Sequence, residues 1–300
     1  MSDPVRPARS PGAGDEVSDA DFARFQGLIH REAGISLAPC KKALLAGRLA
    51  RRMRETGIST LSAYYRQVQA DPAELTRMLD AISTNETHFF REPAHFDLLA
   101  RKVIPAWRAE AEAGRRPKRL RAWSAACSTG QEPFTLAMVL LAELEGWEVE
   151  ILASDLSTAV LERARKAVWP LSLSREIPER YRRAFMLRGT GEAEGTMKAG
   201  PELREVVRFA QVNLIDPAAL PAGRYDLVFC RNVLIYFDAA TRQQVVERLI
   251  DRLAPGGLLF VGHAESLVNV TRRVRPFAPT VYGLDPAGDA IAAGEERTAR

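Results

Sequence analysis

The sequence has few cysteines and no long apolar run. Its three cysteines, Cys40, Cys127 and Cys230, are far apart and odd in number, which argues against a disulfide framework and for a reducing compartment. No apolar stretch approaches the roughly 18 residues that a membrane span needs, and residues 1–17 lack the apolar core of a signal peptide. We therefore expect a cytoplasmic protein without a membrane-inserted segment.

The sequence also lacks a strong excess of charge. Its 300 residues include 42 basic and 38 acidic side chains, interspersed over most of the length, so the net charge of +4 favours an acidic partner only weakly. Hydrophobic residues make up 46% of the chain, enough for the core of one medium domain and a smaller one, a size that suits an enzyme. We expect residues 1–17 and 285–300 to be disordered tails.

Residues 18–92 show helical periodicity without a strand-like run, which predicts a small helical domain. The first helix has a capping candidate at Ser18 and ends at Gly34. Three more helices are predicted at residues 38–57, 61–70 and 72–81.

The second of these predicted helices is amphipathic and has a strongly basic face. Arg48, Arg51 and Arg52 contribute to this face, opposite a side formed by apolar residues. The cationic face either docks an acidic partner or is simply solvated, and the composition alone leaves both open.

After residue 92 the rhythm changes to strands alternating with helices, which predicts a parallel, doubly wound sheet. A helix at residues 93–113 comes first. Strands are predicted at residues 120–126, 147–155, 206–214, 225–233, 256–262 and 280–284, and further helices at 130–146, 157–168 and 239–253.

The segment 169–205 interrupts this alternation, because it is longer than the usual connection between a strand and a helix. It forms either an inserted subdomain, with a small antiparallel sheet whose turns use Gly189, Gly191 and Gly195, or a long surface loop.

In a parallel sheet, ligands bind beyond the carboxyl ends of the strands, so the residues that follow each predicted strand matter most. After the first strand, Gly130 allows a close backbone approach, and Gln131 and Glu132 offer acceptors to a ligand amine. After the second, Asp155 could accept hydrogen bonds from both hydroxyls of a ribose, or cap the helix that follows.

The later strands add Asn213 and Leu214, which could bind and flank an adenine ring, and Arg231 and Asn232 at the cleft. The chain lacks the G-x-G-x-x-G pattern that cradles a pyrophosphate. A nucleoside site without a phosphate cradle favours S-adenosylmethionine over NAD or ATP.

The chain has few histidines. The four, His30, His88, His95 and His263, are scattered along the chain, so we expect packing or surface roles for them and no bound metal.

Several short motifs follow one another along the chain. In order they are "STNETHFFREP", "RAWSAACSTGQEP", "ILASDLS", "VNL", "FCRNVLIYFD" and "GGLLFVGHAESL". Together they closely resemble the CheR-type chemotaxis receptor methyltransferases, and the resemblance covers residues 18–284. It implies a helical N-terminal domain (18–92) followed by a Rossmann-like class I methyltransferase domain (93–284) of α/β fold, with a small inserted antiparallel β-subdomain at about 169–205.

The resemblance also implies the reaction, transfer of a methyl group from S-adenosylmethionine to glutamate side chains of chemoreceptors. By motif, it implies cofactor contacts from Asn85, Thr87 and Arg91, from Gln131 or Glu132, and from Asp155, Asn213, Leu214, Arg231 and Asn232. Relatives that read "GEEP" differ from the "GQEP" of this chain, which leaves Gln131 and Glu132 as alternatives.

This chemistry needs no general base, because a glutamate with a pKa near ~4.3 is already ionised at neutral pH and the sulfonium is already activated. Alignment and desolvation should supply the rate. Arg91 could pair with a carboxylate of cofactor or substrate, and Tyr236 is a candidate for steering the accepting glutamate.

The resemblance suggests uses for two further features. The basic face with Arg48, Arg51 and Arg52 could dock the acidic methylation helices of receptors, and the insert could bind a receptor C-terminal peptide by strand addition. We expect a monomer. Two alternatives are a non-catalytic docking module and a nucleic-acid methyltransferase, although the latter would need a proline-containing loop after the fourth strand.

Overall fold

The computed structural model describes residues 17–284 and divides into two compact units, with the boundary between Ser83 and Thr84. The sequence placed this boundary later, after residue 92. The expected tails lie, apart from Val17, outside the described residues. No helix in the described part of the chain is both long and apolar enough to cross a membrane.

The first unit is helical, as expected. Its helices are α1 (Asp19–Ala33), the short 3-10 turn Pro39–Lys41, α2 (Lys42–Thr56), α3 (Leu61–Ala70) and α4 (Pro72–Ile82). Ser18 caps α1 by accepting from the backbone N–H of Asp21, and Gly34 ends it with a left-handed φ of 71°. The apolar faces of the four helices supply the core of this unit, with Phe25, Leu49, Tyr64 and Met78 fully buried.

A buried carboxylate lies in the middle of this helical unit. Glu74, on α4, is 1% exposed and receives two hydrogen bonds from Arg52 Nη2, at 2.9 and 2.7 Å, and one from the hydroxyl of Tyr64, at 2.8 Å. Burial alone would raise the pKa of Glu74, but the hydrogen bonds from Arg52 and Tyr64 outweigh it and hold the pKa below its usual range. Arg52 therefore serves the interior of this unit.

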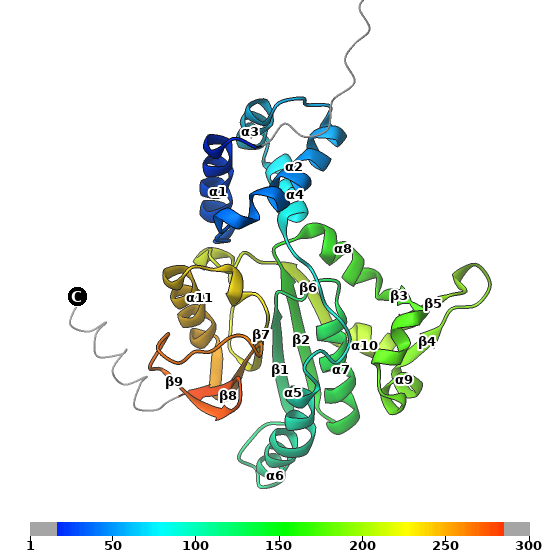
Figure 1. Cartoon of the computed structure of the whole chain (residues 1–300). Coiled ribbons are helices and arrows are strands. Elements are labelled where there is room, and N and C mark those ends of the chain that lie inside the picture. Colours follow the sequence, from blue (N-terminus) through cyan, green and yellow to red (C-terminus); the bar gives the residue numbers. More distant parts are fainter. Residues whose placement is uncertain (1–16, 285–300) are drawn as a thin grey trace, which may run out of the picture. The chain divides into compact units, whose positions relative to one another are not determined.

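The second unit is built on a seven-stranded sheet with the order β6-β2-β1-β7-β8-β10-β9 (Figure 1). Its strands are β1 (Arg119–Ala125), β2 (Glu148–Asp155), β6 (Val207–Gln211), β7 (Tyr225–Cys230), β8 (Leu253–Val261), β9 (Val274–Ala278) and β10 (Val281–Leu284). The first five are parallel, whereas β10 runs antiparallel to β8 and β9 antiparallel to β10. The sheet is therefore mixed, and the expectation of a wholly parallel sheet is corrected by this terminal hairpin.

Helices cover both faces of this sheet. They are α5 (Pro93–Leu98), a π-helical turn (Leu99–Val103), α6 (Ile104–Glu112), α7 (Gln131–Glu143), α8 (Thr158–Lys166), α10 (Pro201–Val206) and α11 (Ala239–Asp251). Alternate residues of each strand point to opposite faces: Leu227 and Phe229 of β7 pack with α5 to α7, and Val228 and Cys230 pack with α11.

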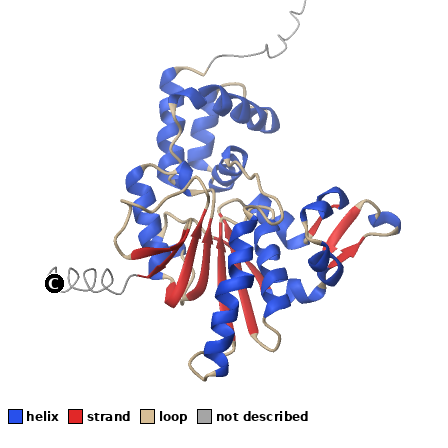
Figure 2. Cartoon of the chain, turned by 60° about the horizontal axis from the view of Figure 1, so that its bottom comes forward, coloured by secondary structure: helices blue, strands red, loops and turns tan. Residues whose placement is uncertain are grey.

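The insert is a subdomain and not a loop. It forms a separate three-stranded antiparallel sheet in the order β3-β5-β4, from β3 (Val168–Pro170), β4 (Met186–Arg188) and β5 (Thr196–Ala199), together with the helix α9 (Glu179–Phe185). Both views show this sheet standing apart from the main one (Figure 2). Between β4 and β5 the chain turns at Gly189, where a Cβ would lie 2.0 Å from the carbonyl oxygen of Ala193.

The buried Arg52–Glu74 pair leads to a prediction for stability. Glu74→Gln should destabilise the helical unit by about 3 kcal/mol, because the mostly buried Arg52 would lose its buried counter-ion. Glu55→Gln, which removes an exposed partner of the same Arg52, should cost no more than about 1 kcal/mol. Scanning calorimetry of the whole protein checks both.

The stability difference between the parent and Glu74→Gln should depend on pH, and the pKa of Glu74 gives the direction. The pKa of Glu74 is depressed in the folded protein, so its stabilisation is present above the unfolded pKa of about 4.3 and is lost as the pH falls through the folded value. The gap between parent and Glu74→Gln should therefore close in acid. An equal gap at neutral and strongly acid pH would contradict this role of the carboxylate.

Candidate functional site

The loop that follows β1 packs against the end of β2. The backbone N–H groups of Ala126 and Cys127 both donate to the carbonyl oxygen of Ser154, each at 2.8 Å, and that of Ser128 donates to Asp155 Oδ2 at 2.8 Å. Three residues of this loop have left-handed φ values: Ala126 (74°), Ser128 (49°) and Gly130 (97°). Such strain outside glycine is rare and gathers at functional sites.

Asp155 ends β2 at this loop and is 8% exposed. Its Oδ1 accepts from the N–H of Ser157 at 3.0 Å, and Oδ2 is bound to Ser128. Ser157, and not Asp155, caps α8, since its hydroxyl accepts from the N–H of Val160. The capping alternative for Asp155 is therefore wrong.

The residues after β6 lie beside Asp155. The N–H of Val212 donates to the carbonyl oxygen of Asp155 at 3.0 Å, which places the following Asn213 and Leu214 at the same edge of the sheet. Leu214 is buried, and Asn213 Oδ1 accepts from the N–H of Ile215. The structure thus brings together three residues that the sequence selected from two separate strands.

At the start of α7 the two acceptor candidates have different environments. Gln131 is 5% exposed and its Oε1 accepts from the hydroxyl of Thr129 at 2.8 Å. Glu132 Oε1 accepts from the hydroxyl of Ser124 at 2.6 Å, and Oε2 pairs with Arg231 Nη1 at 3.1 Å. Burial raises the pKa of Glu132, although Arg231 acts against it. Glu132 is thus committed to an interior ion pair.

Arg231, just after β7, is the centre of this ion-pair network. Its side chain is 1% exposed and contacts Glu92 Oε2 at 3.0 Å, Glu132, and the carbonyl oxygen of Arg91. Asn232, with a φ of 59°, donates from Nδ2 to Glu92 Oε1 at 3.2 Å. The sequence placed both residues at the cleft but gave no sign that their side chains would hold Glu92.

Two carboxylates that the sequence analysis did not select complete the network. Glu92 also accepts from the N–H of His263 at 3.1 Å. Glu265 accepts from the N–H groups of Asn232, at 2.8 Å, and Gly262, at 2.6 Å. Both lie inside motifs quoted above, "FFREP" and "GHAES", but only the fold shows that they meet β7.

The segment 84–92 belongs to the second unit by its contacts, whereas the sequence analysis assigned it to the helical domain. The carbonyl oxygen of Asn85 accepts from the hydroxyl of Ser128 at 2.9 Å, and Arg91 Nη1 donates to the carbonyl oxygen of Glu86 at 2.8 Å. Asn85, Thr87 and Arg91 are half-buried. The segment therefore runs along the loop that follows β1.

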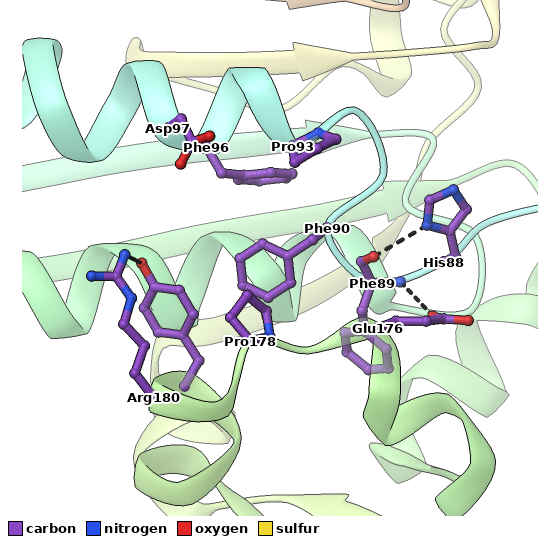
Figure 3. Close-up of a pocket in the computed structure, with 10 residues that line it drawn as sticks. His88, Phe89, Phe90, Pro93, Phe96, Asp97, Glu176, Pro178 and Arg180 are labelled. Atoms are coloured by element: carbon purple, nitrogen blue, oxygen red, sulfur yellow. Dashed lines mark hydrogen bonds between the residues drawn. The ribbon is translucent and has the colours of Figure 1, made fainter.

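Two aromatic side chains anchor this segment. Phe89 packs edge-on against Trp169 at 5.0 Å between ring centroids, and Phe90 stacks with Tyr181 at 5.3 Å. The N–H of Phe89 donates to Glu176 Oε2 at 3.0 Å. Around these rings lies a pocket of about 570 Å³, and Phe90 reaches into it between Phe96 and Pro178 (Figure 3). Both aromatics therefore hold the segment on an apolar surface.

Tyr236, the candidate for steering substrate, lies in a 3-10 turn (Leu234–Tyr236) shortly after Asn232 and is half-buried.

The three arginines of the basic face lie on α2, in the other unit. Arg51 is exposed, with 76% of its side chain accessible, and pairs with Glu55. Arg48 donates to the carbonyl oxygen of Ile82.

If the seven strands of the main sheet are numbered in chain order, their order across the sheet is 3-2-1-4-5-7-6. The first five have the doubly wound arrangement, and the strand order reverses between β1 and β7. The loops after β1, β2, β6 and β7 all carry selected residues, so the candidate site lies at this switch point.

Comparison with known proteins agrees with this geometry. Residues 20–83 match the family described as CheR methyltransferase, all-alpha domain, and residues 85–282 match its SAM binding domain. The chain belongs to the CheR methyltransferase family. The resemblance inferred from the motifs is thereby confirmed, as are the class I methyltransferase fold and the cofactor, S-adenosylmethionine.

Relatives are similar over most of their length. Chemotaxis protein methyltransferase 2 of Pseudomonas aeruginosa is 40% identical over 267 residues, which cover 87% of this chain and 92% of the relative. The chemotaxis protein methyltransferase of Escherichia coli is 40% identical over 275 residues, or 89% and 92%. A solved glycopeptide N-methyltransferase, MtfA, is 18% identical over 61% of this chain and 59% of its own, with a TM-score of 0.32, too weak a likeness to bear on function.

The residues at the switch point fit this cofactor. Asp155 offers a buried carboxylate where a ribose would need acceptors, and the strained loop 126–130 allows a close backbone approach. At Gly130 a Cβ would lie 3.1 Å from that of Ala164, and the φ of 97° disfavours any other residue, so glycine suits this position.

Proposed function

We propose that this protein methylates glutamate side chains of chemoreceptors with S-adenosylmethionine, forming glutamyl methyl esters in chemotaxis adaptation. The observation that carries the proposal is the match of both CheR domains over residues 20–83 and 85–282, combined with an intact switch-point site. The non-catalytic module and the nucleic-acid methyltransferase are not favoured by these relatives. We also propose that it works in the cytoplasm as a monomer, and its unpaired Cys40, Cys127 and Cys230 suit a reducing compartment.

The cofactor supplies an already activated methyl group, so the protein has to bind, align and exclude water. We assign Asp155 to the ribose hydroxyls, Asn213 and Leu214 to the adenine ring, and Gln131 to the methionine amine, because Glu132 is occupied by Arg231 and Ser124. Asn85, Thr87 and Arg91 complete the pocket from the segment above the loop.

Arg231 and Asn232 act, in this proposal, mainly by positioning. The Arg231 guanidinium is committed to Glu92, Glu132 and a carbonyl oxygen, so it holds the segment 84–92 in place. Arg91 is free to present part of its planar fork to a carboxylate of cofactor or substrate. Tyr236 keeps its proposed role in steering the accepting glutamate, and normal methylation by Tyr236→Phe would remove it.

The reaction and its cofactor site can be tested together. The protein should transfer labelled methyl groups from S-adenosylmethionine to receptor cytoplasmic fragments, giving a product that base hydrolyses, as an ester requires. Asp155→Asn should weaken S-adenosylhomocysteine binding in calorimetry by about tenfold or more, because a hydrogen bond to a charged group is worth about 1.5–3 kcal/mol.

Asp216→Asn is the matched control. Asp216 is exposed and only caps the turn after β6, by accepting from the N–H of Ala218 at 2.9 Å. Its substitution should leave cofactor affinity unchanged. A base-stable product would reject glutamate methylation, and equal affinities of Asp155→Asn and the parent would reject the ribose assignment.

We further propose that the basic face of α2 docks the receptor, with one correction. Arg52 pairs with the buried Glu74 and its side chain is 15% exposed, so we leave it out of the docking face. Arg51 is the exposed member. Arg51→Glu should raise the KM for a receptor fragment several-fold, with kcat and cofactor affinity unchanged, because charge complementarity mainly governs encounter.

The control for this variant is Arg31→Glu, another exposed arginine of the helical unit, with 60% of its side chain accessible on α1. Its KM should remain that of the parent. If both variants raise the KM equally, general charge rather than the α2 face steers the receptor.

The finer proposal is that the inserted subdomain tethers a receptor C-terminal peptide by strand addition to β4. The outer edge of β4 pairs with no described strand, and Leu187 on it is 52% exposed. The opposite edge strand, β3, contains Pro170, which has no N–H to donate. This makes β4 the better template.

Calorimetry with receptor C-terminal peptides tests the tether. Leu187→Asp should abolish binding, whereas Val168→Asp on the β3 edge, 40% exposed in the parent, should retain it. Absence of binding to the parent protein would eliminate the tether, and loss in Val168→Asp alone would move it to β3.

A further inference from the structure

Three side chains that could bind a metal ion meet near the start of α5. They are Glu92, His95 and His263, whose candidate ligand atoms all lie within 4.8 Å of one another. Glu92 Oε2 is 3.5 Å from His95 Nδ1 and 3.9 Å from His263 Nε2. The two histidines, scattered in the sequence, are therefore neighbours in the fold, with ring centroids 5.6 Å apart.

The hydrogen bonds of His95 define its tautomer. Its Nε2 lies 2.8 Å from Thr280 Oγ1, and the Thr280 hydroxyl donates its only proton to the carbonyl oxygen of Pro279 at 2.7 Å. Thr280 must then accept from His95, so Nε2 carries the ring proton. Nδ1 of the neutral ring is left with a lone pair.

This lone pair is buried and lacks a donor. His95 is 2% exposed, and within residues 17–284 its Nδ1 has no hydrogen-bond partner. The atom that it faces, Glu92 Oε2, is also an acceptor. Two opposed acceptors with an interior lone pair indicate a position for a cation.

We propose that Glu92, His95 and His263 bind a divalent transition metal ion, best matched by Zn²⁺, through Oε2, Nδ1 and Nε2. Two imidazoles and one carboxylate are a recurrent zinc ligand set. Metal–ligand bonds of about 2.0–2.2 Å in tetrahedral geometry place ligand atoms about 3.4 Å apart, close to the 3.5 Å between His95 and Glu92. His263, whose side chain is 60% exposed, has room to close the remaining distance.

Arg231 limits the affinity of this site for a metal ion. Its Nη2 lies 3.0 Å from the same Glu92 Oε2, so a bound ion shares this oxygen with a guanidinium and is repelled by it. The second oxygen of Glu92 is occupied by Asn232 and by the N–H of His263. We therefore expect micromolar rather than structural-site affinity. The ion would clasp the start of α5 to the end of β8.

Zinc titration calorimetry of the whole protein tests the proposal. The exposed thiol of Cys40 is first removed by Cys40→Ser, because thiolates bind Zn²⁺ by themselves. One site per chain is expected. His263→Ala should weaken it by at least about tenfold, since even residues that only orient a metal ligand cost that much. His263 is exposed, so this variant should fold, which circular dichroism checks without metal.

The matched control is His30→Ala, an exposed histidine on α1, which should bind Zn²⁺ like the parent. Co²⁺ gives a second readout, because a tetrahedral site shows visible absorption that should disappear in His263→Ala. Binding without fixed stoichiometry, equal affinity of His263→Ala and the parent, or loss of the site in His30→Ala would each overturn the proposal. Methyl transfer enters none of these measurements, so the metal site and the enzymatic activity can fail separately.

Discussion

The buried guanidinium of Arg231 is the interaction on which the rest of the site depends. It joins three parts of the chain that are distant in sequence, namely the segment ending at Glu92, the first turn of α7 at Glu132, and the end of β7. Each of these carboxylates would cost several kcal/mol if buried without a partner. The position of the segment 84–92, and hence of Asn85, Thr87 and Arg91, follows from this pairing.

The same edge of the sheet also contains backbone strain. Phe90, Glu92, Ala126, Ser128 and Asn232 all have left-handed φ values, and such residues cost of order 1–3 kcal/mol each. Three of them are held by hydrogen bonds from their N–H groups to buried side chains: Phe90 to Thr135, Ser128 to Asp155 and Asn232 to Glu265. A loop held in this way has its backbone fixed before a ligand arrives, which suits a reaction that depends on alignment.

Features that depend on local periodicity and on the ends of strands could be predicted from the sequence. Contacts between segments that are distant in the sequence could not. The bounds of α3 and α4 and the caps of α1 follow from local pattern. The strand β9 was missed because Pro276 obscures its short run. Arg52 was placed on a docking face because Glu74, its buried partner, lies on another helix. In the same way, the pairing of His95 with His263 depends on the topology of β8 and α5.

The edge of the sheet at the carboxyl ends of the strands carries more negative charge than one arginine neutralises. Glu92, Glu132, Asp155 and Glu265 are brought to the ends of four neighbouring segments, while Arg231 is the cation that the described residues place among the first two. S-adenosylmethionine carries a sulfonium and an ammonium group, and a negative site attracts both.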